Sequence, residues 1–363
     1  MAEEIIKALE GEELQAKIDA VENLQSVPAN QIEQVFKKIS SDLNSEIRYA
    51  AVSQIELCPQ SFQTFIHDID PKIRSFVIQK SVDIRIALKN DSEMISALSK
   101  FVTDTSTEVR IALASVISQH SKLFTDDHGV KTVQETLVPL LEGLLADKCD
   151  DVRVVASQNI KELAFQFGYD FVIEQLYTCL HHMLSDLQWR VRNSAIEMLF
   201  NLALACNLDF FEANLFQFLI QFLQDPSYNV RDFAISHLPS LVIHFGLEWL
   251  NSTLIKSLSE LANSSNFLYR QVYLKSITIL VNLFPVQFRS NYVFQPLIHF
   301  LGDPVDNVVL TSLNCITQNL RLIHPFKVQN ELIPVLESLE INRSKTICEE
   351  SSHLLQKIKL SNK

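Results

Sequence analysis

Aspartate and arginine recur at matched positions along the chain, and they are the first residues whose types and spacing suggest chemistry. Each aspartate lies just before an expected helix, where its carboxylate can cap free backbone N–H groups, and each arginine lies in that helix's first turn. A guanidinium there needs an acceptor, and a carboxylate of an adjacent copy can supply it in two parallel hydrogen bonds. We therefore expect a structural ladder, without a catalytic role, made of Asp147, Arg153, Asp186, Arg192, Asp225, Arg231, Arg270 and Asp303.

The other reactive side chains do not form a catalytic pattern. The ten histidines are dispersed, and the neighbours His181 and His182 would point in different directions on a helix. No glycine-rich nucleotide-binding motif occurs. No His-Glu dipeptide occurs, which argues against a helical-repeat enzyme that binds two irons through such pairs. We predict no enzyme activity, no cofactor and no metal site.

The six cysteines are scattered and form no Cys-x-x-Cys pair. This pattern is typical of small buried hydrophobic residues in a reducing compartment. The acidic start of the chain lacks the features of a signal peptide, and no apolar run is long enough to cross a membrane. We expect the protein in the cytoplasm, with the nucleus as a second compartment.

Large aromatic residues follow the aspartates by three positions, in the expected turns. Trp189, Tyr228 and Phe267 stand 39 residues apart, and Asp306 takes the fourth position. Aromatic and arginine side chains anchor many protein interfaces. Two interpretations stay open: the aromatic side chains contact a partner, or they fold back to cover the turns.

The elements that must position these residues follow from an internal repeat of about 39 residues. The segments that begin at 186, 225, 264 and 303 align, and apolar residues keep the same register. Within a repeat, two stretches show the i, i+3, i+4 spacing of amphipathic helices. The register positions are Phe171/Phe210/Trp249/Phe288, Leu176/Leu215/Leu254/Val293, Leu180/Leu219/Leu258/Leu297, Leu199/Leu238/Ile277/Ile316 and the helix stops Gly168/Asn207/Gly246/Pro285.

This pattern predicts an all-α solenoid of about nine to ten HEAT repeats, each an antiparallel helix pair. The period is irregular over 1–94 and regular over 95–363. In the irregular part, the repeat before Arg74 must be truncated, and Ala16–Ile18 marks a degenerate first copy. An insertion is expected at 125–129. We predict one continuous solenoid. Ser264 in place of aspartate and Val309 in place of arginine predict softer joints near the C-terminal end.

Composition agrees with this fold and restricts the partners. The 363 residues are 47% hydrophobic and include only 6 glycines and 11 prolines, so tight turns are few. The net charge of −12 gives little attraction for nucleic acid or anionic lipid. It indicates either a solvated acidic surface or an acidic groove for a basic partner.

The sequence resembles the scaffold (A) subunit of protein phosphatase 2A. The resemblance rests on Asp-x-x-Trp-Arg-Val-Arg at 186–192, Phe-Gly at 167–168 and 245–246, Leu-Tyr-Arg at 268–270 and Gly-Asp-Pro-Val at 302–305, and it covers about 95–340. It implies a non-catalytic scaffold that binds the phosphatase catalytic subunit through its later turns. The residues that it carries over as contacts are Trp189, Arg190, Tyr228, Phe267 and Val305.

The resemblance is incomplete, so alternatives stay open. The family has fifteen repeats, and the earlier ones bind a regulatory B-type subunit. A regulatory subunit stays a possible partner of the first repeats, but because these repeats are irregular, no contact residue can be assigned to it. Asp306 and Val309 depart from the expected pattern at the last contact. The alternative is a HEAT adaptor for another protein, either a regulatory subunit of a related phosphatase or a transport-type receptor.

Overall fold

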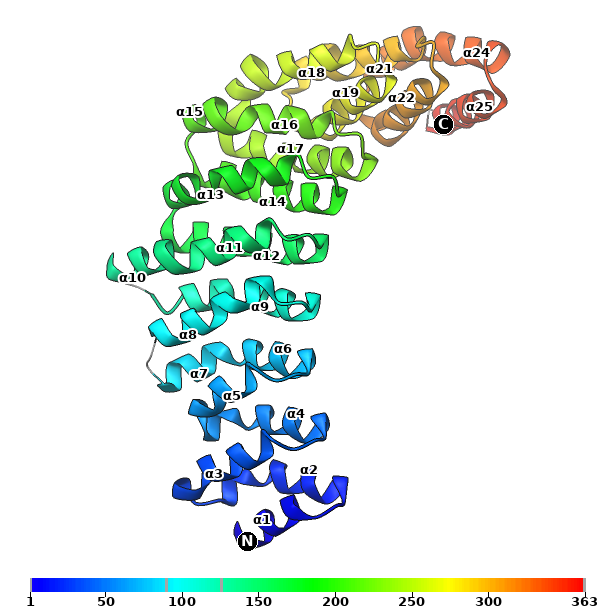
Figure 1. The fold of residues 1–363 in the computed structure, drawn as a ribbon. Coiled ribbons are helices and arrows are strands. Elements are labelled where there is room, and N and C mark those ends of the chain that lie inside the picture. The colour runs from blue at the N-terminus through cyan, green and yellow to red at the C-terminus, as the bar shows by residue number, and fades with distance from the viewer. Residues whose placement is uncertain (1, 89–90, 125–126, 362–363) are drawn as a thin grey trace. The chain divides into compact units, whose positions relative to one another are not determined.

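The computed structural model describes residues 2–88, 91–124 and 127–361, and no β-strand occurs in these ranges. Helices follow one another as antiparallel pairs joined by short turns (Figure 1). The prediction of an all-α solenoid is confirmed, and the described helices group into ten pairs, within the predicted nine to ten. Two compact units, Met1–Met198 and Leu199–Lys363, are described separately below.

The first unit contains six helix pairs, and α7 (Ser81–Leu88) follows the second helix of the third pair. In the fifth pair the short α10 (Asp127–Thr132) precedes the first helix. The pairs are α1 (Ala2–Glu10)/α2 (Leu14–Glu22), α3 (Ala29–Ile39)/α4 (Ser45–Ser53), α5 (Phe62–Phe65)/α6 (Pro71–Gln79), α8 (Asp91–Ser99)/α9 (Thr107–Ser121), α11 (Val138–Leu145)/α12 (Asp150–Phe167) and α13 (Tyr169–Leu184)/α14 (Trp189–Ala205), whose last residues belong to the second unit.

The second unit contains four pairs, three of which have a short leading helix. That helix is α15 (Leu208–Phe210), α20 (Val286–Arg289) or α23 (Pro325–Lys327). The pairs are α16 (Phe216–Leu223)/α17 (Tyr228–Trp249), α18 (Ile255–Ala262)/α19 (Phe267–Ile279), α21 (Gln295–Phe300)/α22 (Asp306–Asn319) and α24 (Ile333–Asn342)/α25 (Lys345–Ser361).

The irregular start of the chain has the predicted features. The truncated repeat is real, because its first helix, α5, has only four residues. The degenerate first copy is the pair α1/α2, in which Lys17 stands where later repeats have arginine. The predicted insertion at 125–129 lies partly outside the described residues. The prediction of one continuous solenoid, with a change of regularity near residue 94, stays a prediction.

Three of the four apolar register positions form the core as expected. Leu176, Leu199 and Leu180, and the nine residues in register with them, are all fully buried. Burial of one Leu or Ile side chain stabilises a fold by about 1.5–3 kcal/mol. The core is therefore the continuous apolar layer between the two helix rows of each unit. Two of the predicted helix stops are marked by positive φ angles: Gly168, at 87°, ends α12, and Gly246, at 91°, breaks α17 before its last turn.

The fourth register position was predicted incorrectly in two copies. Phe171 and Trp249 are buried, but Phe210 is half-buried and Phe288 is 42% exposed. A single π-helical turn begins at Phe211 and another at Ser290, and each adds a residue to its helix turn. The copy at Trp249 is followed by the same kind of turn, at Leu250–Leu254, and stays buried, so the π-turn does not account for the difference. In the copy of Phe210, Phe211 is the buried residue, and its ring lies 5.8 Å from that of Trp249 between centroids.

Candidate partner-binding surface

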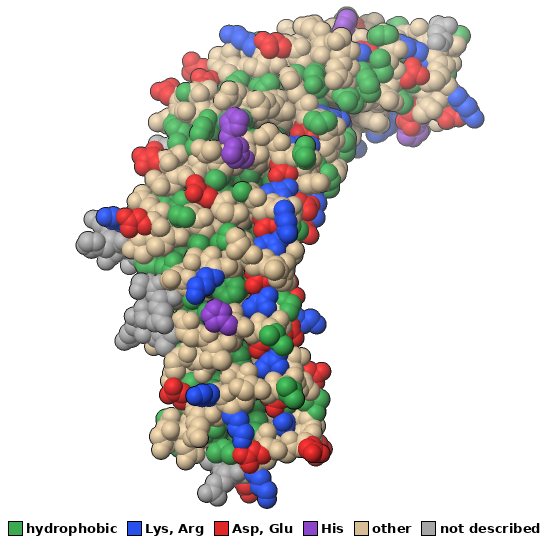
Figure 2. Space-filling model, in the orientation of Figure 1, with side chains coloured by type: hydrophobic (Ala, Val, Ile, Leu, Met, Phe, Trp, Pro, Cys, Tyr) green, Lys and Arg blue, Asp and Glu red, His purple; other side chains and the backbone are tan. Residues whose placement is uncertain are grey.

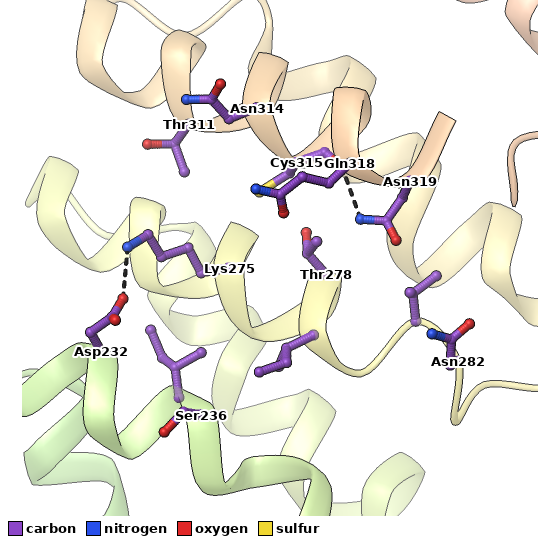
Figure 3. A pocket seen from close by; sticks show the side chains of 13 residues that line it. Asp232, Ser236, Lys275, Thr278, Asn282, Thr311, Asn314, Cys315, Gln318 and Asn319 are labelled. Carbon is purple, nitrogen blue, oxygen red and sulfur yellow. Dashed lines mark hydrogen bonds and ion pairs between the residues drawn. The ribbon is translucent and has the colours of Figure 1, made fainter. Parts of the chain in front are cut away.

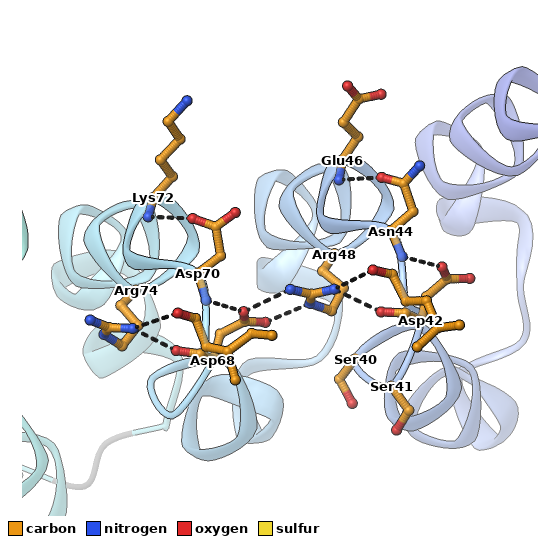
Figure 4. A network of polar contacts seen from close by, with 12 residues as sticks. Ser40, Ser41, Asp42, Asn44, Glu46, Arg48, Asp68, Asp70, Lys72 and Arg74 are labelled. Atoms are coloured by element: carbon orange, nitrogen blue, oxygen red, sulfur yellow. Dashed lines mark hydrogen bonds and ion pairs between the residues drawn. The ribbon is translucent and has the colours of Figure 1, made fainter.

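The predicted ladder is present in the first unit at every joint between consecutive repeats. Arg48 donates two hydrogen bonds to the carboxylate of Asp68 in the next repeat, at 2.8 and 3.0 Å (Figure 4). Its third nitrogen donates to the carbonyl of Asp42 in its own repeat at 2.8 Å. The joints are Lys17–Asp42, Arg48–Asp68, Arg74–Asp104, Arg110–Asp147 and Arg153–Asp186.

The carboxylates do not cap helices in the way the sequence predicted. Asp186 accepts the N–H of Gln188, two residues later and before α14 begins. Asp147 likewise accepts from Cys149 and Asp225 from Ser227. Two extra residues separate the aspartate from the helix, so its carboxylate holds the turn. This geometry leaves the second oxygen of Asp186 free to accept Nε of Arg153.

Burial and pairing act in opposite directions on the ladder carboxyls. Burial raises the pKa of Asp147, but the hydrogen bonds from Arg110 and from the N–H of Cys149 outweigh it, and the pKa stays below its usual value. Asp104 in the first unit and Asp303 in the second show the same balance and the same lowered pKa. These pairs therefore hold ionised carboxylates at neutral pH.

The ladder is incomplete in the second unit. Arg270 pairs with Asp303 at 2.7 Å, as predicted. Arg231 donates to the carbonyls of Asp225 and Pro226, and no carboxylate pairs with it within the described part of the chain. Its expected partner position holds Ser264, whose hydroxyl accepts the N–H of Asn266 and so keeps the turn without a charge.

The second predicted gap, at Val309, is filled from the next repeat. Arg343 donates to the carbonyl of Asp303 at 2.6 Å, the same group that an arginine at 309 would reach by analogy with Arg270. Arg343 also lies 3.4 Å from the carboxylate of Asp306. The softer joint predicted at Val309 is therefore bridged by an arginine that the repeat alignment did not include.

In the first unit, Trp189 and Arg190 begin α14. Trp189 is 40% exposed, so its ring is not part of the buried layer. Arg190 donates to Asp151 at 2.8 Å and lies 3.8 Å from Asp150, both on the preceding second helix. These contacts hold the guanidinium at the surface of the first unit. Arg192, next on the helix, donates to the carbonyls of Asp186 and Leu187.

In the second unit, Tyr228 begins α17 and is 57% exposed. The Nζ of Lys275 lies 4.5 Å from the centre of its ring and donates to its hydroxyl at 3.1 Å. The same Nζ pairs with Asp232 at 2.9 Å. Burial lowers the pKa of Lys275, but these two acceptors outweigh it and raise the pKa above its usual value.

The remaining predicted contact residues are less exposed. Phe267 is half-buried at the start of α19. Val305 is half-buried before α22 and donates its N–H to Asp303. Of the three aromatic residues predicted at turns, Trp189 in the first unit and Tyr228 in the second are therefore the exposed ones.

Sequence reasoning missed a groove on the second-helix row of the second unit (Figure 3). Its volume is about 570 Å³, and α17, α19 and α22 line it. Ser236, Lys275 and Asn314 line it and stand 39 residues apart, so one polar position of the repeat register faces the groove. That shared polar position is the sequence signal from which the groove could have been predicted.

No group of described residues forms a convincing metal or catalytic centre. Cys149, Asp150 and Asp151 lie close enough to share an ion, but both carboxylates already face Arg190. Burial raises the pKa of Cys179 and of Cys206 to about 11, which makes these thiols weak nucleophiles.

The surface has mixed charge on the face shown in Figure 2. Basic and acidic side chains lie interspersed over the helices of the first unit, without a basic stripe on that face. Among the described residues, none of the helices combines the length and the apolar character that a membrane span requires.

Comparison with known proteins gives the fold. No protein-family model and no curated protein match the chain. Among solved structures it is similar to Kap121p bound to Nup53p (TM-score 0.69, 14% identity, 98% of this chain and 40% of that chain). It is also similar to karyopherin Kap121p bound to the SUMO protease Ulp1p (0.68, 14%, 98% and 40%) and to the extreme C-terminus of the protein phosphatase Cdc14p (0.67, 15%, 98% and 41%).

The chain therefore has the fold of a HEAT-repeat solenoid. It spans about two fifths of the length of these neighbours. At 14–15% sequence identity, the likeness to these structures supports the fold alone. The specific resemblance to a phosphatase scaffold is not among these findings, and it is considered below as a proposal.

Proposed function

We propose that the chain is a non-catalytic scaffold that binds the catalytic subunit of a type 2A serine/threonine phosphatase. The contacts are made by the turns before its second helices, and the N-terminal repeats recruit a regulatory B-type subunit. The observation that carries the proposal is the exposure of Trp189 and Tyr228 at matched turn positions. Large aromatic side chains at the edge of a solenoid offer contact area at a low cost in conformational entropy.

The neighbouring charges support this surface. Arg190, which follows Trp189 in the sequence, is held by Asp151, and Lys275 is held over the ring of Tyr228. Side chains that are already ordered lose less entropy when a partner binds. Phe267 and Val305 contribute less, because each is half-buried. The proposal places the complex in the cytoplasm and the nucleus.

A second candidate is an adaptor that carries another protein, in the manner of a transport receptor. The fold likeness to karyopherin Kap121p favours it. The two candidates differ in partner and share the absence of a catalytic group. They can be separated by direct binding.

The first test measures binding of the purified chain to a type 2A catalytic subunit by biolayer interferometry. Trp189→Ala and Tyr228→Ala should each weaken binding about 30-fold, the loss expected of an interface anchor worth about 2 kcal/mol. Phe165→Ala is the matched control, since this aromatic residue is 92% exposed but lies outside the turns.

Two outcomes would reject the proposal. Absence of binding by a folded wild-type chain would remove the phosphatase partner and leave the carrier candidate. A large drop in the melting temperature of Trp189→Ala would instead make this residue part of the core. We expect the melting temperature to stay within about 2 °C, because the side chain is substantially exposed.

A further inference from the structure

The groove between α17, α19 and α22 contains amide side chains that have no partner in the fold. The side-chain amides of Asn282, Asn314 and Gln318 make no hydrogen bond within the described part of the chain, and all three are exposed. Each offers one acceptor and two donors. In Figure 3, Asn314 and Gln318 extend from α22, and Asn282 follows the end of α19.

The floor between these amides is apolar. Ile235 and Cys315 are buried, and Ile279, another lining residue, is 39% exposed. An apolar floor with a few polar groups at its rim is the usual character of a binding pocket, and about 570 Å³ is within the usual size. The groove can therefore exclude water from a chain laid along it.

The charges at the groove cancel each other. Asp232 and Lys275 are its only charged lining residues, and they pair at 2.9 Å. Neither is available to attract a charged ligand without losing its partner. An occupant held by this groove is therefore expected to carry no charge where it contacts the lining.

The spacing of the amides matches an extended peptide. Asn314 and Gln318 are four residues apart on one helix, which separates them by about 6 Å along the axis. In an extended chain, peptide groups on the same edge recur every two residues, about 6.6–6.8 Å. Two successive amides can thus each pair with the N–H and C=O of alternate residues.

We propose that this groove binds an extended, uncharged peptide segment through its main chain. Asn314 and Gln318 hydrogen-bond the peptide edge, Asn282 receives it beyond the end of α19, and Ile279 contacts alternate side chains. Main-chain hydrogen bonds provide the affinity, and the apolar floor selects the side chains between them. The residues that would hold the peptide differ from Trp189 and Tyr228, so failure of the phosphatase contact would leave this proposal standing, although Lys275 borders both surfaces.

The probe is a library of acetylated and amidated octapeptides built from Ser, Thr, Val and Leu. The full chain is incubated with the library, and retained peptides are identified by affinity-selection mass spectrometry. We expect a subset to be retained. Asn314→Ala combined with Gln318→Ala should weaken that subset at least about tenfold, since two hydrogen bonds are lost.

Two controls make the result specific. Gln217→Ala combined with Gln221→Ala removes two exposed amides at the same i, i+4 spacing from α16, a first helix outside the groove, and should leave retention unchanged. Methylation of alternate backbone nitrogens in a retained peptide should abolish binding. The proposal is overturned if no octapeptide is retained, if the Asn314/Gln318 variant retains them equally, or if N-methylation has no effect.

Discussion

The two units use the same repeat but join their copies differently. In the first unit, all five joints carry a cation and a carboxylate from consecutive repeats. In the second unit, Arg270–Asp303 is the pair of this kind, Ser264 leaves Arg231 without a carboxylate, and Arg343 replaces the arginine missing at 309. The Arg–Asp pair is therefore a reinforcement, since the helix pairs stack without it.

The net charge differs between the units as well. Residues 1–198 include 30 acidic and 19 basic residues, whereas residues 199–363 include 13 and 12. Almost the whole acidic excess thus lies in the first unit, and the uncharged groove lies in the second. Since surface charge steers charged partners, the first unit is the better candidate for a basic partner and the second for contacts through apolar and amide groups.

The largest expected effect comes from breaking a complete joint. Arg110→Met leaves the buried carboxylate of Asp147 without its partner, and removal of one member of a buried pair costs about 3–5 kcal/mol. The matched change in the second unit, Arg231→Met, should cost less, because it strands only carbonyl acceptors. Urea unfolding, with hydrogen exchange to localise the change, measures both free energies of unfolding.

Equal losses in the two variants would contradict the comparison, because the carboxylate would then add nothing. The double variant Arg110→Met/Asp147→Asn is the control. It removes both charges, so it should recover part of the stability lost in Arg110→Met.

A change at Arg343 tests whether an arginine from the next repeat stabilises the joint that lacks an arginine at position 309. Arg343→Met should destabilise the second unit by about 1–2 kcal/mol, since the carbonyl of Asp303 loses a charged donor. Chemical denaturation of the variant beside wild type checks this. A loss below about 0.3 kcal/mol would mean that the gap at Val309 is not bridged in energetic terms.

The sequence predicted what depends on periodicity and missed what depends on local geometry. The register of Leu176, Leu180 and Leu199 gave the core, because any residue in phase on an amphipathic helix faces the same layer. Phe288 was placed in the core by the same rule but is 42% exposed, in the four-residue helix α20 that precedes the first helix of its repeat.

The candidate site shows the same limit. The turn position of Trp189, Tyr228 and Phe267 left open whether each ring is exposed, and the structure differs among them: Trp189 and Tyr228 are exposed, and Phe267 is half-buried. Arg343 comes from a loop outside the repeat alignment. The groove beside Lys275 combines three second helices, so no single repeat reveals it.

Ser264→Asp is predicted to restore the missing joint. The separation of 33 residues from Arg231 to position 264 equals that of Arg270 to Asp303, and an open hollow of about 670 Å³ borders Ser264. A new charged pair should stabilise the second unit by about 1 kcal/mol. Ser264→Asn is the control, because it keeps the turn acceptor and adds no charge. Equal melting temperatures for the two variants would argue against pairing with Arg231.

The smallest expected change near neutral pH is the pH dependence of the stability that the Arg110–Asp147 pair provides. The lowered pKa of Asp147 means that its pair with Arg110 stabilises the fold fully above the unfolded pKa, near 4, and that this contribution is lost as the pH falls through the folded value. The stability gap between wild type and Asp147→Asn should therefore be constant from pH 7 to 5 and shrink below about pH 4. The difference between the two proteins cancels the titration of all other groups. A gap that narrows already between pH 7 and 5 would mean that the pKa of Asp147 is not lowered in the folded chain, and the contrast between the units would then rest on geometry alone.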